Sequence, residues 1–249
     1  MSGIDLHTHL SDGRFDPAVF AQGERLGVTR FVCSNIGAYA HHPSPDDVRE
    51  MNAIMIAEMA RHPGRLLGYC YVNPRGGTRT LSDLRHCVED AGMVGIKLWV
   101  SAFADDPLVD PFLEYAAEHR LIVLTHAWRK TTGQLPFEST ADHVARVAAR
   151  HPDVRFLMAH LGGQVESAID AVQPFPNVAV DTSGTIIGAG DVAIAVERLG
   201  ADRVAFGSDL HHSGLAENVG KVLGAGLDAA ALDRVLGGNA RRWLSEVTQ

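Results

Sequence analysis

The sequence has few cysteines and no long apolar run. Cys33, Cys70 and Cys87 form no even set and show no CxxC spacing, so they predict no disulfide framework. We interpret Cys33 and Cys70, which lie in apolar strand-like runs, as buried thiols in a reducing compartment. No apolar run approaches the roughly 20 residues that span a bilayer. The first residues lack the basic and apolar regions of a signal peptide, and we therefore expect a cytoplasmic protein.

The sequence also lacks an excess of basic residues. It has 22 Lys and Arg against 30 Asp and Glu, which gives a formal net charge of −8 with neutral histidines. This balance argues against nucleic acid or an anionic membrane as the main partner. The chain of 249 residues is 46% hydrophobic, which is enough for a large core. We expect one domain over residues 1–249, and the sequence leaves open whether it forms a homo-oligomer.

Short apolar, β-branched runs alternate with longer helical patterns along the whole chain. This alternation is typical of a parallel sheet built from βα units. Eight units follow one another without a linker, which favours a closed (β/α)8 TIM barrel over an open eight-stranded sheet. Strands are predicted near Gly3–His9, Arg30–Asn35, Arg65–Val72, Val94–Val100, Ile122–His126, Val154–His160, Val178–Thr182 and Val204–Ser208.

Helical patterns fill the intervals between the predicted strands, and two further ones follow the last strand as extra C-terminal helices. They are predicted near Pro17–Leu26, Pro45–Arg61, Thr80–Ala91, Leu108–His119, Thr140–Arg150, Gln164–Val172, Asp191–Leu199, Leu215–Leu223, Asp228–Leu236 and Asn239–Glu246.

Polar residues close four of the apolar strands. His7 and His9 are two residues apart on the first strand, so they point to the same face near its C-terminal end. His126, His160 and Asp209 close the fifth, sixth and eighth strands. Taken singly, each has an ordinary explanation, such as a hydrogen-bonded core histidine or an exposed strand end. A barrel would bring them into one ring, where three histidines and a carboxylate suit zinc with an open position for water.

The same segments resemble the amidohydrolase superfamily, and more narrowly its amidohydrolase-2 branch, which includes decarboxylases and lactonases of aromatic-derived acids. The resemblance covers almost the whole chain in the expected order. It is carried by Asp5-Leu6-His7-Thr8-His9, Gly95-Ile96-Lys97-Leu98, Thr125-His126, Ala159-His160-Leu161-Gly162-Gly163, Gly207-Ser208-Asp209 and Gly237-Gly238-Asn239-Ala240-Arg241-Arg242.

The resemblance implies a role for each matching residue. His7, His9, His126 and Asp209 would hold one divalent metal, zinc in our expectation and manganese as the alternative. Asp209 and His160 would be catalytic, with His160 an acid/base residue or else a ligand of a second metal. Lys97 would bind substrate in the barrel mouth, although binuclear relatives carry a carboxylated lysine on this strand, and a merely structural lysine is a further alternative.

Other residues are weaker candidates for substrate binding. Trp99 and Trp128 follow strands 4 and 5 and either wall the pocket or pack under a loop. Arg129 and His211 lie in the predicted mouth, together with further basic loop residues: Arg14, Arg75, Lys130, His212 and the pair His41-His42. A cationic mouth would suit an anionic substrate, with Arg129 as the carboxylate anchor. Solvated loop charges are the alternative explanation.

The expected activity is metal-dependent hydrolysis of a small carbonyl compound, such as a lactone, an ester or a cyclic amide that bears a carboxylate. Metal-activated water would be the nucleophile. The first alternative is a non-oxidative decarboxylase of the same family, since the ligand pattern does not separate the two. An inactive scaffold barrel is a remote alternative, because a complete ligand set argues against it.

Overall fold

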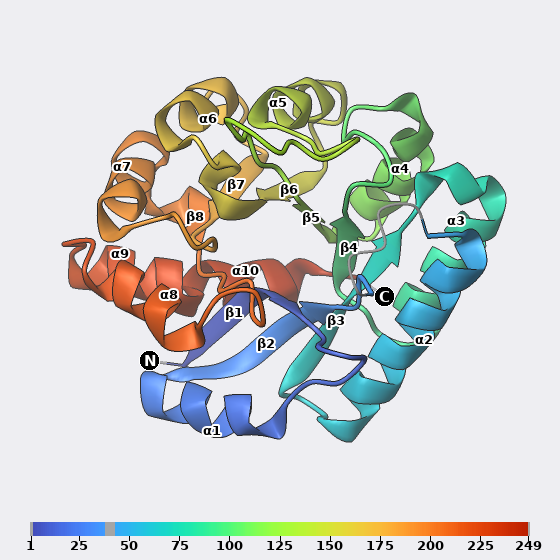
Figure 1. The fold of residues 1–249 in the computed structure, drawn as a ribbon, viewed down its shortest axis with the longest axis horizontal. Helices are drawn as coiled ribbons and strands as arrows, with labels where there is room; N and C mark the ends of the chain where they lie inside the picture. The colour runs from blue at the N-terminus through green and yellow to red at the C-terminus, as the bar shows by residue number, and fades with distance from the viewer. Residues whose placement is uncertain (1, 38–42, 249) are drawn as a thin grey trace.

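A computed structural model of the chain shows eight parallel strands in sequential order around a barrel (Figure 1), and the predicted fold class is confirmed. The structure describes residues 2–37 and 43–248. The strands are β1 (Gly3–His9), β2 (Val28–Ser34), β3 (Leu66–Val72), β4 (Gly95–Leu98), β5 (Ile122–Thr125), β6 (Arg155–Met158), β7 (Val178–Asp181) and β8 (Val204–Ala205).

Helices surround the barrel, and each of the first seven connects two successive strands (Figure 1). They are α1 (Pro17–Leu26), α2 (Pro45–Arg61), α3 (Gly77–Arg85), α4 (Asp110–Glu118), α5 (Ala141–Arg150), α6 (Val165–Val172), α7 (Ala189–Leu199), α8 (Leu215–Leu223), α9 (Ala229–Asp233) and α10 (Asn239–Glu246). Within the described ranges, no helix is long and apolar enough to cross a membrane.

The barrel closes where β1 meets the segment that follows β8. The Leu6 N–H donates to the Phe206 carbonyl at 3.0 Å, and the Asp209 N–H donates to the His7 carbonyl at 2.8 Å. The His9 N–H donates in turn to the Leu210 carbonyl at 2.6 Å. This seam places Asp209 beside the two histidines of β1, although 200 residues separate His9 from Asp209 in the sequence.

A β-bulge in β1 changes which side chains face the barrel axis. Asp5 pairs with Phe31 and Thr8 pairs with Cys33, so β1 has one residue more than β2 in this interval. Strict alternation would send Leu6 and His7 to opposite faces. With the bulge, Leu6 packs in the interior cluster of strand side chains, while His7 contacts polar groups of β4 and β7.

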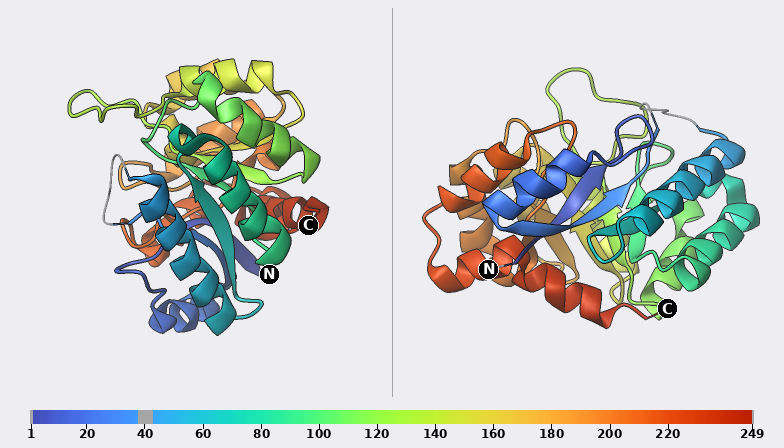
Figure 2. Two further views of the ribbon diagram at one scale, coloured as in Figure 1. Left: turned by 90° about the vertical axis from the view of Figure 1, so that its right-hand side faces the viewer. Right: turned by 90° about the horizontal axis from the view of Figure 1, so that it is seen from below.

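Two hydrophobic layers stabilise the barrel. The larger lies between the sheet and the helices and contains strand residues such as Val123 and Phe156. The smaller fills the barrel interior with the alternate strand residues, such as Leu124 and Leu157, together with Trp243 of α10. Figure 2 shows α10 at one end of the barrel, near both chain termini, while the loop after β5 stands out at the opposite end. The interior is therefore apolar at the α10 end and free to carry polar groups at the other.

Two predicted strand ends differ from the structure. His160 lies two residues beyond β6 in a 3₁₀ turn, Ala159–Gly162, and Asp209 lies four residues beyond β8. Both have positive φ angles, 59° and 57°, which interrupt extended pairing. Such a conformation is uncommon for residues other than glycine and marks a site where side-chain direction matters. The two residues therefore lie in the turns that follow the strands, and their side chains enter the barrel mouth.

Gly95 is the point where β4 leaves no room for a side chain. A Cβ there would lie 2.2 Å from the Ile122 carbonyl oxygen and 2.8 Å from ring carbons of Tyr69. We expect Gly95→Ala to lower the free energy of unfolding by about 1–3 kcal/mol, because the packed interior must shift. Urea unfolding would measure the loss.

Gly190 in α7 is the matched control for Gly95, because a Cβ there meets nothing within 4 Å. Gly190→Ala should stabilise the protein by about 0.5–1 kcal/mol through helix propensity. A Gly95→Ala variant as stable as the wild type would contradict the described packing.

Candidate functional site

Three of the predicted ligands meet at the barrel mouth. His7 Nε2 lies 3.2 Å from His9 Nε2 and 3.5 Å from Asp209 Oδ1, and His9 Nε2 lies 3.3 Å from the same carboxylate oxygen. Ligands at about 2.0–2.1 Å from a tetrahedral zinc ion stand roughly 3.3–3.5 Å apart. The triangle therefore has the dimensions of one face of a metal coordination sphere.

The protonation of these groups also fits a metal ion. His7 Nδ1 lies 2.8 Å from Asp181 Oδ2, and because a carboxylate only accepts, the ring proton is on Nδ1. His7 Nε2 therefore presents a lone pair to the triangle. His9 is held through Nδ1 by the Ser34 hydroxyl at 2.8 Å, and burial lowers the pKa of His9 to about 3, so its ring is neutral at pH 7. Neutral imidazoles and an ionised carboxylate are the forms that bind metals.

Asp209 is the anionic member of the triangle. Burial raises the pKa of its carboxyl group, but the hydrogen bond to His9 and the neighbouring His160 and His7 bring it well below its usual value overall. Two ring nitrogens and a carboxylate oxygen thus converge on one point. This donor set fits a divalent cation.

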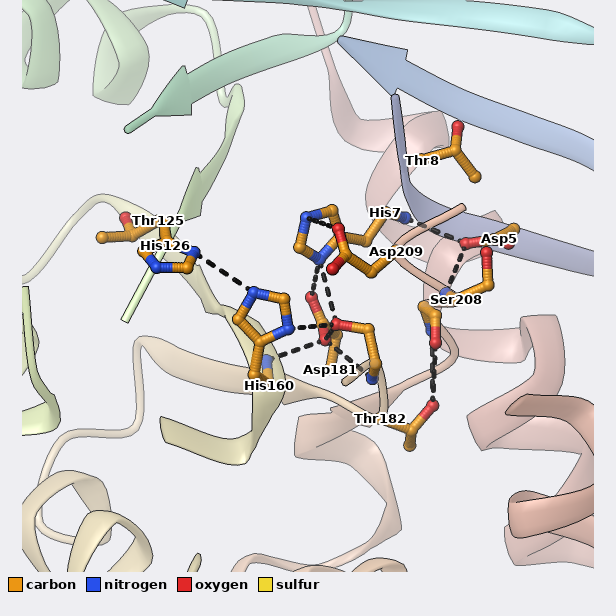
Figure 3. A network of polar contacts seen from close by, with 12 residues as sticks. Asp5, His7, Thr8, Thr125, His126, His160, Asp181, Thr182, Ser208 and Asp209 are labelled. Carbon is orange, nitrogen blue, oxygen red and sulfur yellow. Dashed lines mark hydrogen bonds and ion pairs between the residues drawn. The ribbon is translucent and has the colours of Figure 1, made fainter. Parts of the chain in front are cut away.

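A second group of buried polar residues holds these rings from below (Figure 3). Asp181, at the end of β7, accepts from the His7 ring and from the His160 N–H, and it also accepts from the Ser183 hydroxyl. Ser183 Oγ lies 2.9 Å from His160 Nδ1. Because the Ser183 hydroxyl proton is directed to Asp181, Ser183 accepts from His160 Nδ1–H. The His160 ring therefore turns Nε2 toward His126, as Figure 3 shows.

His126 lies beside His160 rather than in the triangle. Its Nδ1 is 3.2 Å from His160 Nε2, and its Nε2 is 2.9 Å from Oε1 of Glu138. Beside the triangle, two other sets of described side chains lie close enough together to share a metal: His7, His160 and Asp209 in one, and His9, Asp209 and His212 in the other. Burial lowers the pKa of His126 to about 4, so this ring is also neutral at pH 7.

Lys97 is fully buried beneath the triangle. Its Nζ lies 2.9 Å from His7 Nε2 and donates to that lone pair. Burial lowers the pKa of Lys97 to about 8, and the charges of Asp209 and Asp181 oppose a larger shift. The side chain is thus positively charged at neutral pH. It lies among the buried polar groups that contact the proposed metal ligands.

A small cavity opens above these groups. Its volume is about 180 Å³. Ile36, Trp99 and Trp128 form its apolar walls, and the remaining lining residues are His9, His126, His160, Asp209 and His212. Trp128 rests on Gly163, where a Cβ would lie 2.3 Å from the indole Cδ1. Trp99 packs edge-on against His126 at a ring distance of 4.3 Å. Both tryptophans thus wall the pocket.

Two of the expected substrate-binding residues lie away from this cavity. Arg129 pairs with Asp142 and lines a separate depression beside α5 and α6. His211 is exposed and packs its ring against Phe15. Arg75 and Lys130 are also engaged, with the Ser101 carbonyl and with Glu138. The pair His41-His42 lies outside the described residues. Of the described basic candidates, His212 lines the cavity, whereas Arg14, Arg75, Arg129, Lys130 and His211 do not.

The structure adds residues that the sequence argument did not select. They are Ser34, Glu138, Asp181 and Ser183. Asp181 ends the apolar strand Val178–Asp181, which is the same signal that identified His126. Glu138 lies in an irregular loop twelve residues after His126, and no local pattern distinguishes it.

Comparisons with known proteins agree with this geometry. A sequence model of the amidohydrolase family matches residues 4–245. A search of curated protein sequences found no match.

Solved structures of similar fold include several decarboxylases. A 2,6-dihydroxybenzoate decarboxylase from Rhizobium is 16% identical, with a TM-score of 0.80 over 98% of both chains. A dihydroxybenzoic acid decarboxylase from Polaromonas, with bound manganese and the inhibitor 2-nitroresorcinol, is 15% identical, with a TM-score of 0.81 over 98% of this chain and 97% of that one. A 5-carboxyvanillate decarboxylase from Sphingomonas paucimobilis is 15% identical, with a TM-score of 0.77 over 99% of both chains.

At such identities the solved structures show the fold alone, whereas the family match covers nearly the whole sequence and includes every residue of the metal-binding geometry described above. The chain therefore belongs to the amidohydrolase superfamily of metal-dependent enzymes.

Proposed function

We propose that the protein is a metal-dependent, non-oxidative decarboxylase of a monocyclic aromatic acid. The cavity carries this proposal. A cavity of about 150 Å³ accommodates benzene, so about 180 Å³ suits one ring with small substituents. Trp99 and Trp128 offer aromatic faces to such a ring. The decarboxylases of similar fold act on, or bind analogues of, single-ring hydroxylated acids.

The absence of a cationic anchor favours decarboxylation over the hydrolysis that we expected first. Among the described residues that line the cavity, none is arginine or lysine. A hydrolase substrate with a spectator carboxylate would need such an anchor away from the metal. A carboxylate that is itself the reacting group needs none, because it binds at the metal position. The substrate is then still an anion, as expected, but its charge is held at the triangle.

His7, His9 and Asp209 would hold one divalent metal, with His126 as the fourth protein ligand. Three imidazole nitrogens and a carboxylate suit zinc, and manganese is the metal named with two of the similar structures. The bound metal would supply Lewis acidity for the substrate's carboxylate and for an adjacent oxygen. Lys97 would remain an uncarboxylated amine, because it donates to His7 and is surrounded by Asp181 and Asp209.

The chain's own residues account for the proton that decarboxylation requires. The bond between the ring carbon and the carboxylate breaks, its electron pair stays on the ring, and carbon dioxide leaves. His160 first takes up a proton from solvent at the Nε2 lone pair and then delivers it to that carbon, where a new C–H bond forms. Ser183 keeps Nδ1 of the same ring occupied, so Nε2 is the transferring atom. Asp209 borders the same cavity and would help to transfer a proton from water to His160 before the next turnover.

The reaction is tested by loading the protein with manganese or zinc and incubating it in D₂O with 2,6-dihydroxybenzoate. We expect carbon dioxide release and one deuterium atom at the vacated ring carbon, detected by NMR. The methyl ester should be inert, because it has no free carboxylate. Hydrolysis of an aromatic lactone without any carbon dioxide release from hydroxybenzoates would instead establish the hydrolase alternative.

The ligand set predicts a loss of bound metal from single substitutions. Removing a second-layer partner of a metal ligand typically costs about 10–100-fold in affinity. His9→Ala removes a ligand itself, so we expect a larger loss while the circular dichroism spectrum is retained. The same applies to His7, His126 and Asp209. Metal analysis after dialysis provides the measurement, with His211→Ala as the neighbouring control. Full metal occupancy in His9→Ala would exclude the assignment.

His160 should separate catalysis from metal binding. We expect His160→Asn to retain about one metal per chain and to lose roughly 10²–10⁴-fold in kcat, which is the usual contribution of a general acid or base. Steady-state kinetics and metal content are measured on the same preparation. Loss of one of two bound metals in this variant would instead show His160 to be a ligand of a second ion.

A further inference from the structure

Glu138 is a buried carboxylate whose surroundings consist of donors. Its side chain is fully buried, and Oε1 lies 2.7 Å from Lys130 Nζ and 2.9 Å from His126 Nε2. Oε2 accepts from Gln134 Nε2 and from the Leu135 N–H, both at 2.9 Å. Both carboxylate oxygens therefore accept two hydrogen bonds each.

Three of these four partners can only donate in this arrangement. Lysine and a backbone N–H have no acceptor, and the Gln134 amide presents its NH₂ group. His126 alone has a choice, since a neutral imidazole carries its proton on either nitrogen. A carboxylate has no proton to offer at neutral pH, and a positively charged lysine shares the same oxygen. The His126 proton must therefore be on Nε2.

This tautomer has a consequence at the site. With the proton on Nε2, the lone pair of His126 is on Nδ1, the atom that lies 3.2 Å from His160 Nε2. Ser183 likewise leaves a lone pair on His160 Nε2. The opposite tautomer of His126 would place a hydrogen on Nδ1, where it would bond to His160 and close this position to a metal.

We propose that Glu138 is a positioning residue that fixes the Nε2–H tautomer of His126 and so directs the Nδ1 lone pair toward the metal. Its hydrogen bonds also tie the loop after β5 to the ligand, since Lys130, Gln134 and Leu135 all lie in that loop. The inference rests on the proposed metal site and not on the proposed reaction. It concerns a loop residue outside the motifs that carry the family resemblance.

The wild-type protein without metal offers the first test. Long-range ¹H–¹⁵N NMR correlations distinguish the two ring nitrogens of a neutral histidine, and comparison with His126→Gln assigns the signal. We expect His126 to carry its proton on Nε2 in the wild type. A proton on Nδ1 would overturn the proposal without any variant of Glu138 having to fold.

Glu138→Gln provides the second test. An amide NH₂ group in place of either oxygen faces two donors, and His126 is the partner that can respond by moving its proton to Nδ1. We expect this tautomer change together with about a 10–100-fold loss of manganese or zinc affinity, measured by competition with a chelator. A substrate assay is not needed, so failure of the decarboxylase proposal would leave this result interpretable.

Glu58→Gln is the matched control for Glu138→Gln. Glu58 is also a buried glutamate with one backbone N–H donor, from Phe15, and it has two basic partners, Arg61 and His62. It does not line the cavity. It should lose comparable thermal stability and keep its metal affinity. Equal metal affinities in the two variants, or an unchanged His126 tautomer in Glu138→Gln, would show that Glu138 only stabilises the loop.

Discussion

The seam between β1 and the segment after β8 determines the geometry of the site. Its backbone hydrogen bonds join Leu6, His7 and His9 to residues 206–210, and the Asp5 carboxylate strengthens it by accepting from the N–H groups of His7 and Ser208. A buried hydrogen bond contributes only about 0.5–1.5 kcal/mol net, but leaving its donor unpaired costs about 1–3 kcal/mol. The barrel therefore closes in one register, and that register sets the spacing of the three converging ligand atoms.

Burial then determines the chemistry of the groups that the seam brings together. The ring pKa values of His9, His126 and His160 are all lowered, with loss of solvation as the largest cause, so neutral imidazoles are available at physiological pH. Lys97 offsets part of the negative charge of Asp181 and Asp209. The site thus combines buried charged groups with a cavity that two tryptophans wall, an arrangement that suits a charged group reacting on an apolar ring.

The sequence was sufficient for the architecture, because apolar periodicity and strand order follow directly from burial. It also selected His7, His9 and Asp209, since polar residues that end apolar strands meet in a barrel. It missed the β-bulge, which depends on pairing between β1 and β2, and it missed Glu138, which depends on the path of an irregular loop. Arg129 shows the limit of charge patterns: proximity to His126 in sequence did not bring its side chain to the cavity, because it pairs with Asp142 in the first turn of α5.

Asp181 and Ser183 contact both His7 and His160, one a proposed metal ligand and the other a proposed proton carrier. The two rings consequently share a single scaffold for their orientation and tautomeric form. A substitution in this scaffold that alters the proton carrier would therefore also alter the orientation of the metal ligand. New activities on this barrel are therefore more accessible through the apolar cavity walls, formed by Ile36, Trp99 and Trp128, than through Asp181 and Ser183, which hold both rings.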